Sequence, residues 1–157
     1  MSIQQIASFS VIGISVRTTN ENGQSGTDIP ALWEKFMSEG ILEKIPNKVD
    51  HTLYCIYTDY EKDHTKPYTT ILGCKVSDLT EIPDGMVSKT FSEASYERFV
   101  ATGNLMHGAV FDEWTKIWDS DLNRSFTADF EVYDSRSQDP ENAEVDIFVA
   151  VNSDESK

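Results

Sequence analysis

The spacing of hydrophobic and polar positions changes several times along the chain, and each change predicts a new element. Short runs rich in β-branched and aromatic residues are typical of strands, and they occur at residues 9–18, 51–59, 68–76, 86–91, 126–134 and 144–151. Apolar residues at helical spacing predict a helix that begins with Asp28 as its N-cap and ends near Gly40. A second helix is expected over 106–118, after a short irregular or helical segment at 92–103.

The predicted elements follow the order strand, helix, strand, strand, and this order occurs twice. Tight polar turns between consecutive strands indicate antiparallel pairing, which gives an α+β fold. The sequence therefore predicts a single domain over residues 1–157, made of two pseudo-repeats at about 5–78 and 82–152. These duplicated units would be related by pseudo-twofold symmetry, with the antiparallel sheet arranged around a central ligand cleft.

Charge limits the classes of partner. The 157 residues include 13 Lys and Arg and 27 Asp and Glu, giving a formal net charge of −14. Because phosphate contacts need clustered basic side chains, direct nucleic-acid binding is not expected. Most of the negative charge lies in residues 79–157, which favours a cationic partner. No segment approaches the roughly 18 apolar residues of a membrane span, and the first residues lack a basic signal-peptide region, so a cytoplasmic protein is expected.

Signals for metal, cofactor or nucleophile chemistry are weak. Cys55 and Cys74 are expected to be free thiols, since a cytoplasmic compartment is reducing. The three histidines, His51, His64 and His107, lack the spacing of zinc ligands. The chain contains no phosphate loop, dinucleotide fingerprint or nucleophile elbow. The sequence therefore predicts no metal, no cofactor and no catalytic residue.

The strand predicted at 126–134 carries the most informative polar residues. Side chains of a strand alternate between its faces, so one face is expected to pack on a helix and the other to be polar. The expected core face holds Phe126, Ala128, Phe130 and Val132, and the polar face holds Thr127, Asp129, Glu131 and Tyr133. On a solvent-facing strand Glu131 would be a hydrated surface acid. In a groove with aromatic walls, the same carboxylate would be a receptor for an organic cation.

Aromatic side chains that could form such walls recur on the second predicted helix. Phe111, Trp114 and Trp118 lie on one helical stripe. Phe111 is expected in the core, whereas Trp114 and Trp118 are pocket candidates because the edge of an indole often reaches beyond the core. Trp33 on the first helix and Tyr54 on the strand at 51–59 complete the candidate walls.

Several segments together resemble a known family. They are 29–36 (IPALWEKF), 53–61 (LYCIYTDYE), 67–76 (PYTTILGCKV), 82–86 (IPDGM), 130–133 (FEVY) and 144–147 (EVDI). In this order they are similar to the gyrase-inhibitor-like effector-binding domains, which are the ligand-sensing modules of AraC-type and multidrug-responsive MerR-type bacterial regulators. The chain looks similar to stand-alone members of this family, including integron cassette proteins that bind cationic drugs.

The resemblance implies a duplicated fold with a central cleft. In the multidrug regulators a buried glutamate accepts the cationic ligand, and its position matches Glu131. Tyr133 matches a pocket-lining position of the same regulators. No helix-turn-helix pattern accompanies the module here, so a stand-alone effector-binding domain is expected.

The function predicted from these observations is the binding of an amphipathic organic cation or drug, with Glu131 as the charge anchor. Two alternatives remain open. One is a protein-interaction inhibitor of an enzyme such as DNA gyrase, acting partly through its negative charge. The other is a small-molecule hydrolase that uses Glu131 as a general base.

Overall fold

A computed structural model describes residues 3–63 and 65–152. Within them, one antiparallel sheet is formed by β1 (Ile3–Ile6), β2 (Phe9–Thr18), β3 (Leu53–Thr58), β4 (Tyr68–Val76), β5 (Val87–Phe91), β6 (Ala94–Gly103), β7 (Ala128–Tyr133) and β8 (Ala143–Ala150). The helices are α1 (Ser25–Ser38), α2 (Ile41–Lys44) and α3 (Ala109–Trp118). Short 3-10 turns lie at Glu21–Gly23, Leu105–His107, Ser135–Ser137 and Pro140–Asn142.

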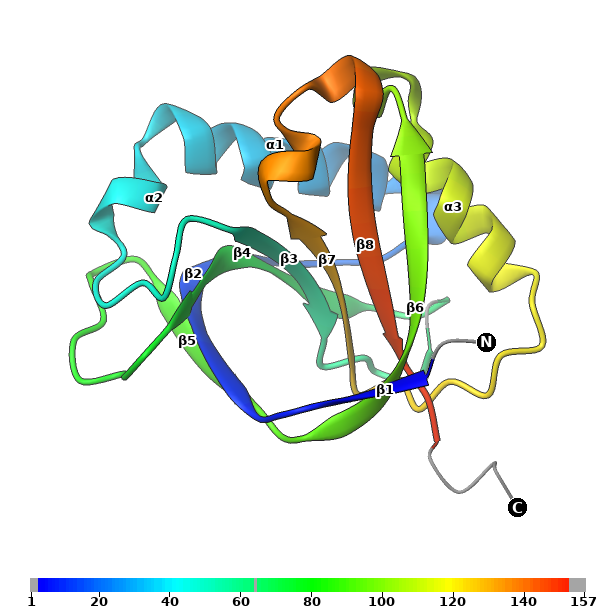
Figure 1. Cartoon of the computed structure of the whole chain (residues 1–157), viewed down its shortest axis with the longest axis horizontal. Helices are drawn as coiled ribbons and strands as arrows, with labels where there is room; N and C mark the ends of the chain where they lie inside the picture. Colours follow the sequence, from blue (N-terminus) through cyan, green and yellow to red (C-terminus); the bar gives the residue numbers. More distant parts are fainter. Residues whose placement is uncertain (1–2, 64, 153–157) are drawn as a thin grey trace.

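The predicted α+β fold with duplicated units is confirmed. The first unit is β2–α1–β3–β4 and the second is β6–α3–β7–β8. The strands lie in the order β1-β6-β8-β7-β3-β4-β2-β5, so β3 of one unit pairs with β7 of the other at the centre of the sheet. Figure 1 shows α1 and α3 on the same side of the curled sheet, one over each unit.

The sheet curls into a half-barrel with an aromatic interior. Phe9 on β2 and Phe130 on β7 have ring centroids 5.5 Å apart, although β4 and β3 lie between their strands in the sheet. This contact is possible only on the inside of a strongly curved sheet. Tyr54, Tyr96 and Phe148 pack against Phe130 in the same interior.

The helices cover the outer face. Leu32 and Phe36 of α1 pack with Ile12, Cys55 and Leu72 of the first unit. Trp114 and Ile117 of α3 pack with a separate group on the second unit, formed by Ala101, Val145, Ile147 and Val149. The prediction that Phe130 and its neighbours face a helix is therefore wrong. The Phe130 side of β7 faces the barrel interior, and the Glu131 side faces the helices.

Residues 94–103 form strand β6, which corrects the expectation of an irregular or helical segment. The strand is hydrogen-bonded on both sides, to β1 and to β8. These pairings satisfy its backbone and override the mixed local propensity of a run that contains Ala, Glu and Arg. The first strand of the second unit is thus β6, while β5 pairs with β2 at the edge of the sheet.

The first helix begins earlier than predicted. α1 starts at Ser25 because a 3-10 turn at Glu21–Gly23 leads directly into it, and no side chain caps its first residue. Asp28 lies in the first turn instead of capping it, and its carboxylate accepts a hydrogen bond from Gln24 (2.9 Å). A negative charge there still suits the positive end of the helix dipole.

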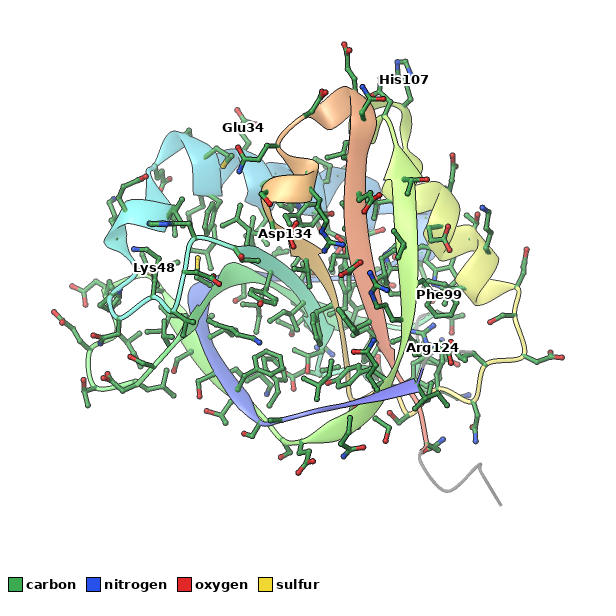
Figure 2. All side chains as sticks on the ribbon, in the orientation of Figure 1. Glu34, Lys48, Phe99, His107, Arg124 and Asp134 are labelled. Carbon is green, nitrogen blue, oxygen red and sulfur yellow. The ribbon has the colours of Figure 1, made fainter. Side chains whose placement is uncertain are left out.

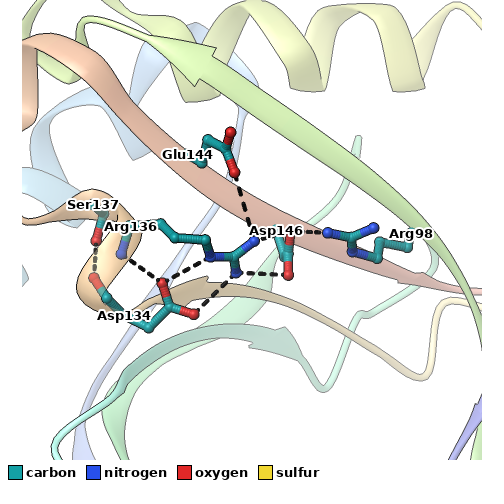
Figure 3. Close-up of polar contacts among 6 residues, drawn as sticks. All are labelled: Arg98, Asp134, Arg136, Ser137, Glu144 and Asp146. Atoms are coloured by element: carbon teal, nitrogen blue, oxygen red, sulfur yellow. Dashed lines mark hydrogen bonds and ion pairs between the residues drawn. The ribbon is translucent and has the colours of Figure 1, made fainter.

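Ion pairs link β6, β8 and the turn that follows β7 in the second unit. Arg136 donates to Asp134 (2.9 Å) and to Asp146 (2.8 Å), and Arg98 donates to Asp146 from β6 (2.9 Å), as Figure 3 shows. The hydrogen bonds from Arg136 hold the pKa of Asp134 below its usual range. These acids are thus compensated by cations of the same chain.

Two glycines permit the curl. Gly13 on β2 and Gly73 on β4 lie opposite each other. A Cβ added to Gly73 would lie 2.2 Å from the carbonyl oxygen of Ile12, and one added to Gly13 would lie 2.1 Å from that of Leu72. No other residue type fits at either position without a backbone shift.

We therefore expect Gly73→Ala to lower the free energy of unfolding by roughly 1–3 kcal/mol, because the added methyl overpacks the strand pair. Gly26→Ala is the matched control. Gly26 lies in α1 with nothing near its Cβ position, so this change should be neutral or stabilise by up to about 1 kcal/mol. Urea denaturation measures both. Equal midpoints for Gly73→Ala and the unchanged protein would show that the close approach is not a constraint.

Candidate functional site

The candidate site lies where the two units meet. In the central β3–β7 pair, Glu131 is opposite Cys55, and Tyr57 is opposite Asp129. Their side chains share the outer face, which α1 and α3 cover from either side. Tyr57 and Tyr133 contact both helix-covered clusters, so this position is the junction of the two cores.

Glu131 is a buried carboxylate held by three aromatic side chains. Only 2% of the residue is exposed. Its Oε2 accepts hydrogen bonds from the Tyr57 hydroxyl (2.7 Å) and from Nε1 of Trp114 (2.7 Å), while Oε1 accepts from the Tyr133 hydroxyl (2.5 Å). All three donors are neutral groups. The charge of the carboxylate is therefore hydrogen-bonded but has no cation among these contacts.

Burial raises the pKa of Glu131 above its ordinary value, and the three hydrogen bonds oppose that rise by stabilising the ionised form. Burial also raises the pKa values of Tyr57 and Tyr133 well above the usual tyrosine value, so both hydroxyls keep their protons and remain donors. The site therefore combines an acceptor that favours a positive partner with donors that stay neutral.

Aromatic rings surround this carboxylate. Trp33 of α1 packs edge-on against Tyr133, with centroids 4.8 Å apart, and Trp114 of α3 packs edge-on against Tyr57 at 5.7 Å. Trp118 continues the second contact, 6.3 Å from Trp114. Helix α1 thus contributes one indole around Glu131, and α3 contributes two.

A second carboxylate lies two residues away on the same strand face. Asp129 is fully buried and accepts hydrogen bonds from Arg124 Nη2 (2.7 Å), from the backbone N–H of Ala150 (2.8 Å) and from the Tyr60 hydroxyl. Figure 2 places Arg124 near the end of the sheet below α3, whereas His107 and Glu34 lie at the opposite edge of the molecule. Asp129 is thus neutralised by a cation, whereas the hydrogen-bond donors of Glu131 among the described residues are neutral.

A cavity of about 100 Å³ lies beside these groups, between α1 and α3. Aromatic side chains dominate its lining, which includes Tyr57, Tyr60, Tyr68, Phe111, Trp114, Trp118 and Arg124. Phe111 is 61% exposed and lines the mouth, so the expectation that it lies in the core is wrong. Its ring packs edge-on against Trp118, which leaves an apolar rim open to solvent.

Five of the six residues predicted from the sequence come together. Glu131, Tyr133 and Trp114 are joined by hydrogen bonds, and Trp33 and Trp118 pack against them. The structure does not bring Tyr54 to this group. Tyr54 is opposite Val132 and lies in the barrel interior with Phe9 and Phe130, on the other face of the sheet.

Sequence reasoning missed Tyr57, Tyr60 and Arg124. Tyr57 follows from β3 once its register is known, because a shift of one residue exchanges the two faces of a strand. In the observed register Tyr57 lies opposite Asp129, and Tyr54 lies opposite Val132. Tyr57 therefore shares the face of Asp129 and Glu131, and Tyr54 lies on the other face. Tyr60 and Arg124 lie outside the strands, and no periodic pattern marks them.

Among residues 3–63 and 65–152, no three His, Cys, Asp or Glu side chains gather in a way that could hold a metal ion. His64 lies outside the described residues. Cys55 and Cys74 are both buried free thiols. No helix in the described ranges has the length and apolar character needed to cross a bilayer.

Solved structures with this fold include an integron cassette protein from the mobile metagenome of Vibrio cholerae. It is 32% identical to this chain, with a TM-score of 0.73, and the alignment covers 96% of this chain and 95% of that one. The protein SAV2435, solved bound to tetraphenylphosphonium, shares the fold at 18% identity with a TM-score of 0.81, over 99% of this chain and 95% of that one.

Among curated proteins, YobU of Bacillus subtilis (strain 168), an inferred transcriptional regulator, is 27% identical over 143 residues. The match covers 88% of this chain and 89% of YobU. The resemblance to regulator effector domains is thereby confirmed. Residues 2–151 match the family described as integron-associated effector binding protein, and the chain therefore belongs to that family.

Proposed function

We propose that the protein binds amphipathic organic cations between α1 and α3, with Glu131 as the charge anchor. The observation that carries this proposal is the buried Glu131 carboxylate, whose three hydrogen-bond donors are neutral aromatic side chains. The ligand of the similarly folded SAV2435, tetraphenylphosphonium, has the chemistry that such a site would accept. In tetraphenylphosphonium the positive charge is surrounded by four phenyl rings.

The energetics favour a cation that is itself apolar on the outside. A buried carboxylate without a counter-charge has lost hydration that neutral donors replace only in part. A lipophilic cation restores the missing charge at little desolvation cost of its own. The faces of Trp114 and Tyr57 would add cation–π attraction, about 0.5–2 kcal/mol for each well-placed ring.

The cavity must enlarge for such a ligand. At about 100 Å³ it is well below the roughly 300–1,000 Å³ of drug-sized pockets. Two apolar side chains of the lining are not fully buried: Phe111 is mostly exposed, and Trp118 is partly buried. We infer that their displacement opens the site while the Glu131 hydrogen bonds hold the anchor in place.

Cys55 is a poor candidate for a nucleophile. It is opposite Glu131 in the β3–β7 pair, and its thiol contacts the Tyr57 hydroxyl (3.5 Å). Burial and the Glu131 charge raise the pKa of Cys55 well above its usual value, so the unreactive thiol form predominates. This environment suits packing, and it gives no support to a hydrolase that would use Cys55 as its nucleophile.

The anchor is tested by Glu131→Gln. We expect affinity for tetraphenylphosphonium to fall by about tenfold or more, equivalent to at least about 1.4 kcal/mol, because the amide has no charge. Affinity for neutral tetraphenylmethane derivatives of matched solubility should change little. Tryptophan quenching and calorimetry measure both. Asp112→Asn, an exposed carboxylate on α3, is the control for net charge. Equal cation affinity in Glu131→Gln and the unchanged protein would refute the anchor.

Cation binding should also depend on pH. The pKa of Glu131 is raised in the free protein, so lowering the pH protonates it before an ordinary glutamate would be protonated. A bound cation favours the ionised form, and therefore affinity should rise with pH through that pKa and then level off. Calorimetry in buffers of different ionisation enthalpy should detect proton release on binding. In Glu131→Gln, cation affinity should not depend on pH in this range, and binding should release no proton. If the affinity of this variant still rises with pH, the group that titrates is not Glu131.

The exposed rim gives a further test. Phe111→Ala should weaken binding of tetraphenylphosphonium by roughly two- to fivefold, in line with one exposed cation–π contact. Its midpoint of urea unfolding should barely change, because the side chain is mostly exposed. Met37→Ala on α1, another exposed apolar residue, is the control and should not affect binding. If both variants bind equally well, the rim does not form part of the site.

A further inference from the structure

Arg124 carries a positive charge at the edge of the proposed ligand site. Its guanidinium carbon lies 5.8 Å from the ring centre of Trp114, the same indole that donates to Glu131. It lies 4.3 Å from the ring centre of Phe126 on the other side. The Arg124 side chain is only 5% exposed. An internal cation thus already occupies a position among aromatic rings.

The two carboxylates of the site differ in how their charge is compensated. Asp129 pairs with Arg124 at 2.7 Å, whereas the hydrogen-bond donors of Glu131 are neutral. Both project from the same face of β7, two residues apart, which separates them by roughly 7 Å. Without Arg124, this face would present two uncompensated buried anions at a spacing that a small dication can bridge.

The backbone supports the position of Arg124. Phe126 adopts a left-handed conformation with φ 55°, which is rare for a bulky residue. This conformation brings its ring against the guanidinium, and Tyr60 packs edge-on against the same ring at 5.6 Å. Such strain is typically retained at functional positions.

We infer that Arg124 sets the charge of the accepted ligand at one. By neutralising Asp129 it leaves Glu131 as the anion that an incoming cation meets. The second charge of a dication would lie near the guanidinium and be repelled, because charges interact strongly where water is excluded. This inference rests on the proposed function and adds a specificity-determining residue to it.

The test compares two ligands of one scaffold. These are 4-methylbenzyl-trimethylammonium, a monocation, and para-xylylene-bis(trimethylammonium), which carries a second ammonium on the same ring. We expect the unchanged protein to bind the monocation more tightly. In Arg124→Met the ratio of dication to monocation affinity should rise by about tenfold or more. Arg124→Lys keeps the charge and should keep the original preference.

Arg124→Met leaves Asp129 buried without its partner and is expected to be destabilised. Two further variants therefore test the same charges in other combinations. The double variant Arg124→Met with Asp129→Asn removes both charges and should prefer the monocation again. Asp129→Asn alone leaves the guanidinium uncompensated. It should weaken binding of the monocation severalfold and binding of the dication more, because the unpaired guanidinium repels both. If Arg124 has a purely structural role, the ratio of dication to monocation affinity will be the same in all folded variants.

The outcomes separate the two claims. If the unchanged protein binds neither tetraphenylphosphonium nor the ammonium monocation, the proposed function itself fails. If it binds the monocation and all folded variants show the same dication-to-monocation ratio, only the role of Arg124 is overturned. A ratio that rises in Arg124→Met and returns in the double variant supports the inference.

Discussion

The pairing of β3 with β7 is the interaction on which the rest of the structure depends. It joins the two strand–helix–strand–strand units into one sheet and places Cys55 and Tyr57 of the first unit opposite Glu131 and Asp129 of the second. Each unit brings its own helix to the outer face, so the two helices border the central pair. The site therefore exists only where the units meet, since each half alone supplies just part of it.

The curl of the sheet separates two different environments. Inside it, rings from distant strands pack together, and the glycine pair at Gly13 and Gly73 allows the close backbone approach that the curvature needs. Outside it, the helix-covered cores leave a narrow cavity between them. A polar residue on β7 thus meets either an aromatic interior or the helix junction, and a step of one residue decides which.

The junction of the two units differs from the rest of the protein in how its carboxylate charge is compensated. The chain is strongly acidic, yet several described carboxylates are matched by arginines, as Arg136 pairs with Asp134 and Asp146. Glu131 differs because its hydrogen bonds come from neutral aromatic groups in a place where water is largely excluded. A buried charge held in this way is costly for folding, and a bound cation would offset part of that cost, which is the physical basis of the proposed ligand site.

The sequence by itself determined the class of fold, because hydrophobic periodicity is local: β2 and β4 occupy the residues predicted for them. Alternation along β7 also placed Glu131 and Tyr133 on one face. The tertiary structure alone decided that 94–103 is a strand, since pairing with β1 and β8 overrides its propensity. It also decided which face the helices cover, placing Tyr57 in the site and Tyr54 outside it. Strand register and the position of Arg124 depend on contacts between residues far apart in the chain, and no local pattern encodes such contacts.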